Sequence, residues 1–271
     1  MLFRGIGIVS AVLAAAKGIH SDVLTGLLYF PVYYLELAAV AFGFLVAVSY
    51  VVDPDREQEK DSPFYRWVIR VYVEALMMVM GVKTKTEGLE KLPKEGRFLL
   101  VCNHQFAADP GILLHYFRHA QLAFISKKEN RKLFCVGRLM HKILCQELDR
   151  EDDRQALRVI LKCVKIIRED QASIAVFPEG GTNHDALLHP LKPGVFKIAQ
   201  KTGVPIVVCT IQGTRNVIRN AIRLKKTRVQ LRLVEVLKPE TLAGMTTVDI
   251  AQRVYDIMAR DLGPELVAPA E

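Results

Sequence analysis

The residues of this chain best suited to acid–base chemistry are a histidine and an aspartate five positions apart. His104 and Asp109 follow an apolar run over residues 98–101, which predicts a buried strand. Pro110 and an apolar stretch come directly after Asp109, so we expect a helix to begin there with Asp109 as its N-cap. A carboxylate that holds an imidazole in one tautomer makes it a better general base. The pair therefore predicts a proton-abstracting dyad with no nucleophilic side chain beside it.

Three other interpretations of this segment stay open. A lone histidine near an aspartate is most often a feature of a surface loop, and Asp109 could serve only as a helix cap. Cys102 lies two positions before His104, so in a strand both side chains would point to the same face, as a thiol nucleophile and base would require. The apolar neighbours of Cys102 instead indicate a buried, inert thiol.

A second cluster follows the apolar run at residues 173–177. There Pro178 and Glu179 are followed by Gly180 and Gly181. Adjacent glycines after a buried strand let the backbone approach a ligand and point N–H groups at it. Glu179 could order a hydroxyl or a basic partner, and the alternative is a tight turn with a solvated glutamate.

The elements that must position these residues alternate between strand and helix from residue 82 onward. Continuously apolar strands indicate a sheet covered on both faces, so we expect an α/β fold with a mixed, largely buried sheet covered by helices. The pattern predicts strands over residues 82–87, 97–102, 122–126, 173–177, 205–210 and 228–237. It predicts helices over residues 110–119, 131–144, 152–168, 195–202 and 246–261.

The N-terminal segment is apolar enough to enter a membrane. Residues 23–52 are almost continuously apolar, and about 20 such residues cross a bilayer. The shorter apolar run over residues 5–16 resembles a signal-peptide core, but a cleaved signal is disfavoured because an anchor follows at once. We expect one spanning helix, or two helices forming a hairpin or a half-inserted element; the alternative is a buried core helix.

A charged linker follows, over residues 53–63, and then a helix-spaced apolar pattern. Trp67, Arg66 and Arg70 near its start favour a helix at the membrane interface, with packing on the next domain as an equal alternative. The predicted organisation is a membrane-embedded helical part (1–52), a linker with an interfacial helix (53–81) and an α/β domain (82–271).

Composition narrows the class of partner. The 37 basic and 29 acidic residues give a net charge of +8, which suits nucleic acid, anionic membrane or acidic substrates. The apolar N-terminus favours membrane, and no basic–aromatic run resembles a nucleic-acid-binding module. His115 and His119 are four positions apart, as two metal ligands on a helix could be, but no third metal ligand lies nearby. We therefore interpret them as structural residues. Five cysteines without Cys-x-x-Cys spacing are expected to be buried free thiols, as in a reducing compartment.

Together the two clusters resemble a known family, the glycerolipid acyltransferases, and most closely the bacterial 1-acyl-sn-glycerol-3-phosphate acyltransferases. The resemblance covers about residues 82–236. It rests on four ordered blocks, which are Asn103-His-x4-Asp109, Ser126-Lys-Lys-Glu129 with Gly137 and Leu148-Asp-Arg150, Phe177-Pro-Glu-Gly180, and Val204-Pro-Ile-Val-Val208.

The resemblance implies fatty acyl transfer from acyl-CoA or acyl carrier protein to 1-acyl-sn-glycerol-3-phosphate, making phosphatidic acid. In this mechanism His104 is the general base, Asp109 orients it, N–H groups around Gly180 stabilise the oxyanion, and no metal or cofactor is required. The chain would be a membrane enzyme whose catalytic domain faces the cytoplasm. The alternatives are a different lysophospholipid acceptor or an inactive membrane lipid-binding protein.

One departure from the family bears on the acceptor. The third block usually continues Glu-Gly-Thr-Arg, and its arginine is taken to contact the acceptor phosphate; here the aligned residues are Gly181 and Thr182. Arg150 and Lys192 are the remaining candidate anion contacts, with Thr182 offering only a hydroxyl. The basic segment over residues 210–232 could contact anionic headgroups or coenzyme A phosphates, or be a solvated loop and strand face.

Overall fold

The core of the molecule is a mixed seven-stranded sheet that places the end of one central strand at its middle. The computed structural model describes residues 1–149, 152–181, 185 and 187–269. The strand order is β1-β7-β6-β2-β5-β3-β4, and all neighbours are parallel except β6 and β7. The strands are β1 (Val82–Glu87), β2 (Leu99–Cys102), β3 (Leu122–Lys127), β4 (Gln146–Leu148), β5 (Ser173–Val176), β6 (Ile206–Gln212) and β7 (Thr227–Leu237). The predicted α/β fold with a mixed, buried sheet is confirmed.

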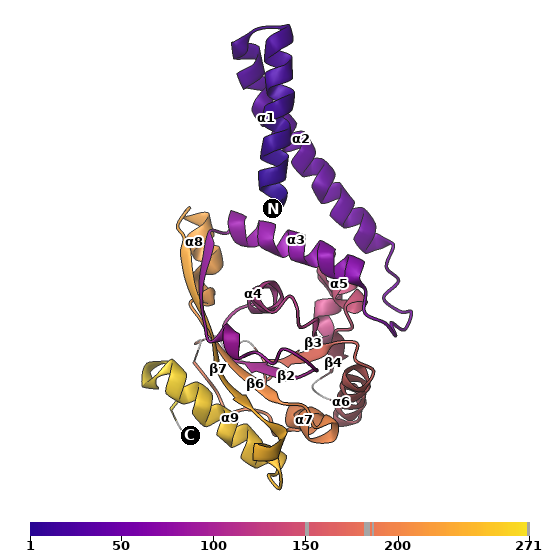
Figure 1. Cartoon of the computed structure of the whole chain (residues 1–271), viewed down its shortest axis with the longest axis vertical. Coiled ribbons are helices and arrows are strands. Elements are labelled where there is room, and N and C mark those ends of the chain that lie inside the picture. Colours follow the sequence, from indigo (N-terminus) through magenta and orange to yellow (C-terminus); the bar gives the residue numbers. More distant parts are fainter. Residues whose placement is uncertain (150–151, 182–184, 186, 270–271) are drawn as a thin grey trace.

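Helices cover both faces of this sheet, as its apolar strands require (Figure 1). Side chains alternate along a strand, so Leu99 and Val101 of β2 join the core under α6, α7 and α9, whereas Leu100 and Cys102 face the core under α3 and α4. The helices of the body are α3 (Pro63–Val79), α4 (Asp109–Tyr116), α5 (Val136–Lys142), α6 (Asp153–Arg168), α7 (Lys197–Thr202), α8 (Val217–Ile222) and α9 (Thr247–Leu262).

The structure differs from the predicted elements in three places. Strand β4 was not expected, because it is three residues long and begins with Gln146 and Glu147. The helix predicted over residues 131–144 is confined to α5, since Cys135 has a positive φ of 57° and a 3-10 turn (Lys128–Lys132) precedes it. The basic segment over residues 210–232 contains the short helix α8 between β6 and β7.

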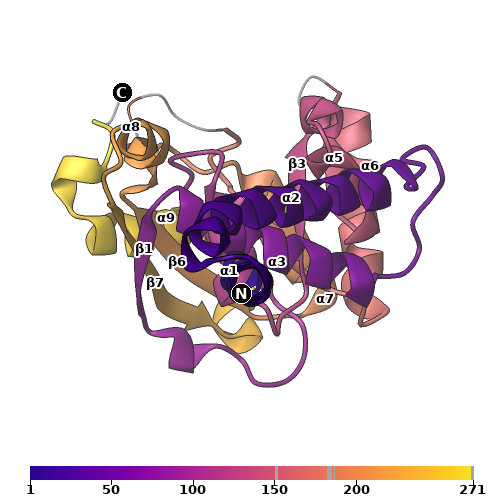
Figure 2. The same ribbon diagram turned by 90° about the horizontal axis from the view of Figure 1, so that it is seen from above.

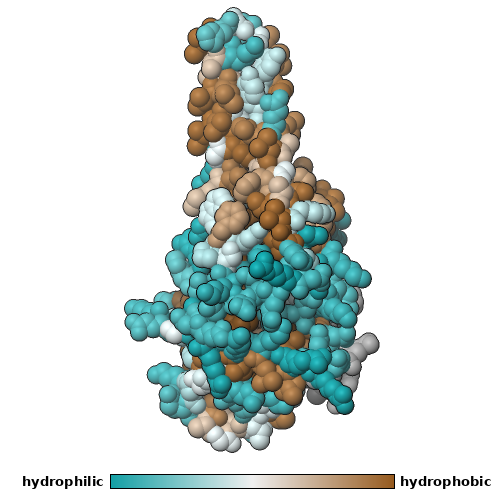
Figure 3. All heavy atoms as spheres, turned by 90° about the vertical axis from the view of Figure 1, so that its right-hand side faces the viewer, coloured by the Kyte–Doolittle hydropathy of each residue, from teal (hydrophilic) through white to brown (hydrophobic). Residues whose placement is uncertain are grey.

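Two apolar helices, α1 (Leu2–His20) and α2 (Val23–Tyr50), form a hairpin that projects from the body (Figures 1 and 2). Helix α2 runs through Pro31 without ending. Only 17% of the most apolar part of α1 and 6% of that of α2 are buried, which argues against a buried core helix. Both are long and apolar enough to cross a membrane, and Figure 3 shows the hydrophobic surface gathered on the hairpin. These helices indicate membrane association.

Close packing at two glycines holds the hairpin together. A Cβ atom on Gly26 would lie 2.8 Å from the carbonyl oxygen of Ala14 and 3.0 Å from the Cα of Gly18. Only glycine permits this approach of two helix backbones, as in other membrane helix pairs. The first residue also contacts the body, because the N-terminal amine lies 2.6 Å from Glu74 of α3. Helix α3 therefore lies between the hairpin and the sheet (Figure 1).

Candidate active site

The loop that follows β2 is held to the neighbouring strand β6 by two buried amide side chains. The Asn103 amide donates to the carbonyl oxygen of Ile211 at 2.9 Å and accepts from its N–H at 2.7 Å. The side-chain oxygen of Gln105 accepts from the N–H of Gly213 at 2.9 Å. These bonds continue the sheet pairing past the last residue of β2, so the backbone of His104 between them has a defined position.

His104 and Asp109 form the expected pair. The Nδ1 atom of His104 lies 2.9 Å from Oδ2 of Asp109. An ionised carboxylate can only accept, so we assign the proton to Nδ1, which leaves Nε2 as the basic nitrogen. Asp109 is fully buried, whereas the His104 side chain retains 14% of its exposure, enough for a ligand to reach the ring.

Asp109 has a different local role from the predicted one. Helix α4 includes Asp109 as its first residue, and its N-cap is Ala108. Oδ2 of Asp109 instead accepts from the backbone N–H groups of Gln105 and Phe106, each at 2.8 Å, as well as from His104. The prediction that Asp109 caps the helix is therefore wrong, because the carboxylate closes the preceding loop around the histidine.

The residues that follow β5, which lies next to β2, supply the rest of the site. The His104 ring stacks on that of Phe177, with centroids 4.1 Å apart. One carboxylate oxygen of Glu179 accepts from the N–H of His104 at 2.8 Å, and the other accepts from the N–H of His189 at 3.1 Å. Burial raises the pKa of the Glu179 carboxyl above its usual range, although these two N–H bonds oppose the shift.

Gly180 and Lys192 lie against each other beside Glu179. Gly180 has a φ of 84°, and a Cβ atom there would lie 2.7 Å from Cε of Lys192. The Lys192 backbone N–H donates to Pro178 at 2.8 Å, which fixes the base of this side chain. Among the described residues no carboxylate pairs with the Lys192 ammonium group. It remains a candidate anion contact.

The expected oxyanion donors change in one respect. The N–H of Gly180 donates to the carbonyl oxygen of Phe177 at 3.1 Å, so it is already used within the turn. Gly181 follows in a bend and is partly exposed. Two further candidate residues, Thr182 and Arg150, lie outside the described residues.

A basic residue that was not singled out as a site residue also reaches this region. Arg215 follows Gly213 after β6, and its guanidinium donates to the carbonyl oxygen of Asp185 at 2.8 Å. Asp185 in turn pairs with His189 at 2.9 Å. The available signal was the run Gly213-Thr214-Arg215 directly after a buried strand, which resembles the Gly-Thr-Arg expected after Glu179.

The thiol alternative does not agree with the structure. Cys102 is fully buried, and burial raises the pKa of its thiol well above the usual range. The nucleophile would be the thiolate, which this environment disfavours. All five cysteines are buried and free, as predicted. The arrangement thus offers a general base with an oriented imidazole, and it can activate a hydroxyl brought in by a substrate.

Comparisons with known proteins agree with this chemistry. A family described as acyltransferase matches residues 83–212. The chain is 32% identical to a chloroplast 1-acyl-sn-glycerol-3-phosphate acyltransferase of Brassica napus, over 59% of this chain and 45% of that protein. It is 28% identical to the 1-acyl-sn-glycerol-3-phosphate acyltransferase of Haemophilus influenzae, over 72% of this chain and 78% of that protein.

Among solved structures the fold is similar to that of the 1-acyl-sn-glycerophosphate acyltransferase of Thermotoga maritima. That match has a TM-score of 0.61 and 24% identity, and it covers 84% of this chain and 89% of the other. The chain spans between 45% and 60% of the length of several curated relatives, including those of Brassica napus and Mycoplasma pneumoniae.

Proposed function

We propose that this chain is a member of the acyltransferase family, whose model matches residues 83–212, and that it transfers a fatty acyl group from an acyl thioester to the free hydroxyl of 1-acyl-sn-glycerol-3-phosphate. The donor is acyl-CoA or acyl carrier protein, and the product is phosphatidic acid for phospholipid synthesis. The observation that carries the proposal is the His104–Asp109 pair, whose geometry leaves Nε2 of a partly exposed imidazole free to accept a proton.

In the proposed reaction, His104 Nε2 takes the proton of the acceptor hydroxyl as its oxygen attacks the thioester carbonyl. The tetrahedral intermediate then collapses, the carbon–sulfur bond breaks, and the proton on His104 passes to the leaving thiolate. Asp109 holds the ring and stabilises the imidazolium between the two steps. Of the N–H groups around Gly180, that of Gly181 is the proposed oxyanion donor, since that of Gly180 is used by Phe177.

We place the acceptor phosphate between Lys192 and Arg215. Both basic side chains come from loops that meet at the carboxyl ends of β5 and β6, where Glu179, Asp185 and His189 join them. An arginine binds phosphate through two parallel N–H bonds, so Arg215 can fill the role of the arginine that is absent after Gly181. Thr182 and Arg150 remain candidate contacts by the sequence resemblance alone.

The thioester donor carries phosphate groups of its own. A basic cavity beside β1 and β7 is suited to bind them. It has a volume of about 510 Å³ and is lined by Lys83, Lys85 and Arg228, with Gly213 at one side. Gly213 is bonded to Gln105, next to His104. We propose that this cavity receives the phosphorylated carrier of the thioester, a chemistry that coenzyme A and acyl carrier protein share.

The N-terminal part would hold the enzyme where its substrates are. We propose that residues 1–52 are embedded in the membrane, that residues 53–81 lie at its surface, and that residues 82–271 form the catalytic domain. The five free thiols favour a reducing compartment, so we propose the cytoplasmic face. A lysophospholipid would then reach the active site while its acyl chain stays in the bilayer.

The test is an acceptor panel with purified full-length protein and radiolabelled acyl-CoA. Lysophosphatidic acid is expected to be acylated in preference to lysophosphatidylcholine, which bears a neutral headgroup. The Arg215→Gln variant should raise KM for lysophosphatidic acid about tenfold, because one charge-assisted phosphate contact is lost. Arg219→Gln, an exposed arginine on α8, is the matched control.

Two outcomes would change the assignment. Preference for a neutral acceptor would favour a different lysophospholipid, the alternative raised by Gly181 and Thr182 at the positions of the expected threonine and arginine. No transfer to any acceptor, with folded protein, would favour a membrane lipid-binding protein.

A further inference from the structure

A cavity at the opposite edge of the sheet from His104 has the composition of an anion site. It lies between α3 and the end of α4 and has a volume of about 220 Å³. Its lining includes Phe117 and Leu122, at the amino end of β3. Because β2, β5 and β3 are parallel, this is the edge remote from the carboxyl end of β2, where His104 lies.

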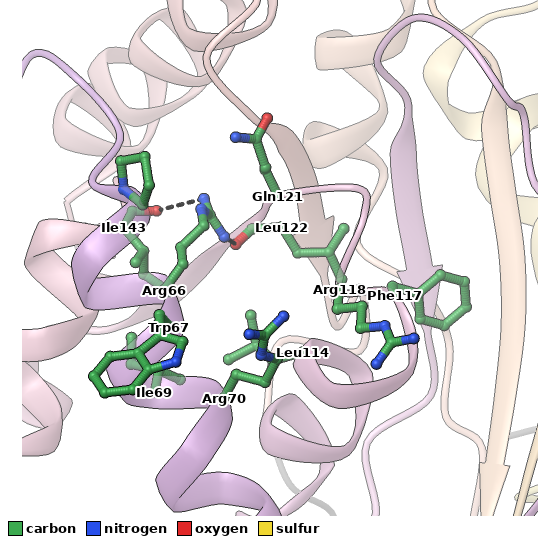
Figure 4. A pocket seen from close by; sticks show the side chains of 11 residues that line it. Arg66, Trp67, Ile69, Arg70, Leu114, Phe117, Arg118, Gln121, Leu122 and Ile143 are labelled. Carbon is green, nitrogen blue, oxygen red and sulfur yellow. Dashed lines mark hydrogen bonds between the residues drawn. The ribbon is translucent and has the colours of Figure 1, made fainter.

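Three arginines surround the cavity (Figure 4). Arg66 is committed to structure, since it pairs with Asp61 at 2.6 Å and donates to the carbonyl oxygens of Leu122 and Ile143. Arg70 and Arg118 are exposed and form no ion pair with any described carboxylate. With Asp61 as the carboxylate paired to Arg66, the site keeps two uncompensated positive charges.

The surroundings of the cavity indicate where its ligand comes from. Helix α3 lies directly beneath the apolar hairpin (Figure 1), and it exposes Phe64, Trp67 and Leu76, at 47%, 47% and 58%. Tryptophan beside arginine on an otherwise apolar helix is typical of the level of lipid headgroups. These surroundings favour a lipid phosphate over a soluble one as the ligand.

We propose that this cavity binds the phosphodiester headgroup of an anionic membrane phospholipid, with Arg70 and Arg118 as its cationic contacts and Trp67 at its rim. The site is separate from the acceptor site, and it does not depend on the proposed reaction. Its ligand would be a bilayer lipid that is bound and not consumed.

The chain provides its own probe, because Trp67 is its only tryptophan. Full-length protein in detergent micelles is titrated with dihexanoyl phosphatidylglycerol, dihexanoyl phosphatidylcholine or inorganic phosphate while Trp67 emission is followed. We expect a saturable change with phosphatidylglycerol, weakened on the order of tenfold in an Arg70→Gln, Arg118→Gln double variant. Arg253→Gln with Arg260→Gln, on α9 at the far end of the body (Figure 1), makes the same charge change and should leave the titration unaltered.

The Arg215→Gln variant separates this inference from the proposed function. Its acceptor site is altered, so a titration like that of the wild type assigns the signal to the cavity. Equal responses to phosphatidylcholine and phosphatidylglycerol would overturn the charge recognition, and inorganic phosphate saturating at the same concentration would overturn the lipid source. The absence of a saturable change, or an undiminished affinity in the double variant, would overturn the site itself.

Discussion

A single carboxylate oxygen organises the proposed catalytic loop. Oδ2 of Asp109 receives three N–H donors, one from the His104 ring and two from the backbone of Gln105 and Phe106. The same atom therefore fixes the tautomer of the base and the shape of the loop that carries it. These two roles can be separated by substitution.

Asp109→Asn retains an oxygen that can accept the two backbone bonds but removes the negative charge that stabilises the imidazolium. We expect kcat to fall about 10²–10⁴-fold with little change in melting temperature. Asp109→Ala also leaves two buried N–H groups without their acceptor, at about 1–3 kcal/mol each, so it should lower both kcat and the melting temperature. Equal melting temperatures for the two variants would contradict the structural role.

Glu179 predicts a particular dependence of stability on pH. At low pH its carboxyl is neutral in both the folded and the unfolded chain, so the folded state is not penalised. As pH rises, the unfolded carboxyl ionises first, because burial raises the pKa of the folded one. Stability from this residue is therefore lost as pH rises through the folded pKa.

The measurement compares melting temperatures of the wild type and the Glu179→Gln variant between about pH 4 and pH 8. The difference, wild type minus variant, is expected to decrease as pH rises, because only the wild type acquires a buried charge. A difference that increases with pH would mean that the N–H bonds from His104 and His189 outweigh burial.

Residue types and short spacings were enough to predict the catalytic pair, but not how it is held. His104 and Asp109 are five positions apart, within reach of local reasoning. Asn103 and Gln105 anchor the loop through Ile211 and Gly213, each 108 positions away. Nothing in the sequence around residue 103 indicates that partner, because it follows only from β6 pairing with β2.

At the scale of elements, long apolar patterns were predictive and short polar ones were not. Strands β2 and β5 are buried throughout, and β6 is buried except at Gln212. All three agree with their predicted positions to within about two residues at each end. Strand β4 pairs with β3 over three residues, and its polar sequence carries no strand signal. Helix α8 has six residues, too few for the 3.6-residue periodicity to emerge from the surrounding arginines.

The hairpin gives a test at this scale. A leucine at Gly26 would collide with the backbone of α1 at Ala14 and Gly18, so Gly26→Leu should force the two helices apart. Overpacking typically costs about 1–3 kcal/mol, and the melting temperature in detergent should fall. Gly43→Leu on the same helix is the control, because a Cβ there meets nothing within 4 Å. Equal melting temperatures for the two variants would show that this contact does not hold the hairpin.

At the scale of the whole molecule, helix α4 joins the two proposed sites. Its first residue, Asp109, orients His104, and Phe117, just past its end, lines the cavity beneath α3. The helix rises about 12 Å over its eight residues. The proposed catalytic residues thus lie at the carboxyl ends of β2 and β5, and the cavity lies near the amino end of β3. Helix α3 covers the same face of the sheet as α4, and the hairpin lies above it (Figures 1 and 2).

His104 is the proton acceptor in the proposed reaction, and one measurement tests this role most directly. Full-length wild type and the His104→Ala variant are compared for acyl transfer from radiolabelled acyl-CoA to lysophosphatidic acid, with the exposed His119→Ala as control. We expect His104→Ala to lower kcat about 10²–10⁴-fold in a protein that still unfolds cooperatively, and His119→Ala to have the wild-type rate. A folded His104→Ala variant with a kcat close to that of the wild type would contradict it.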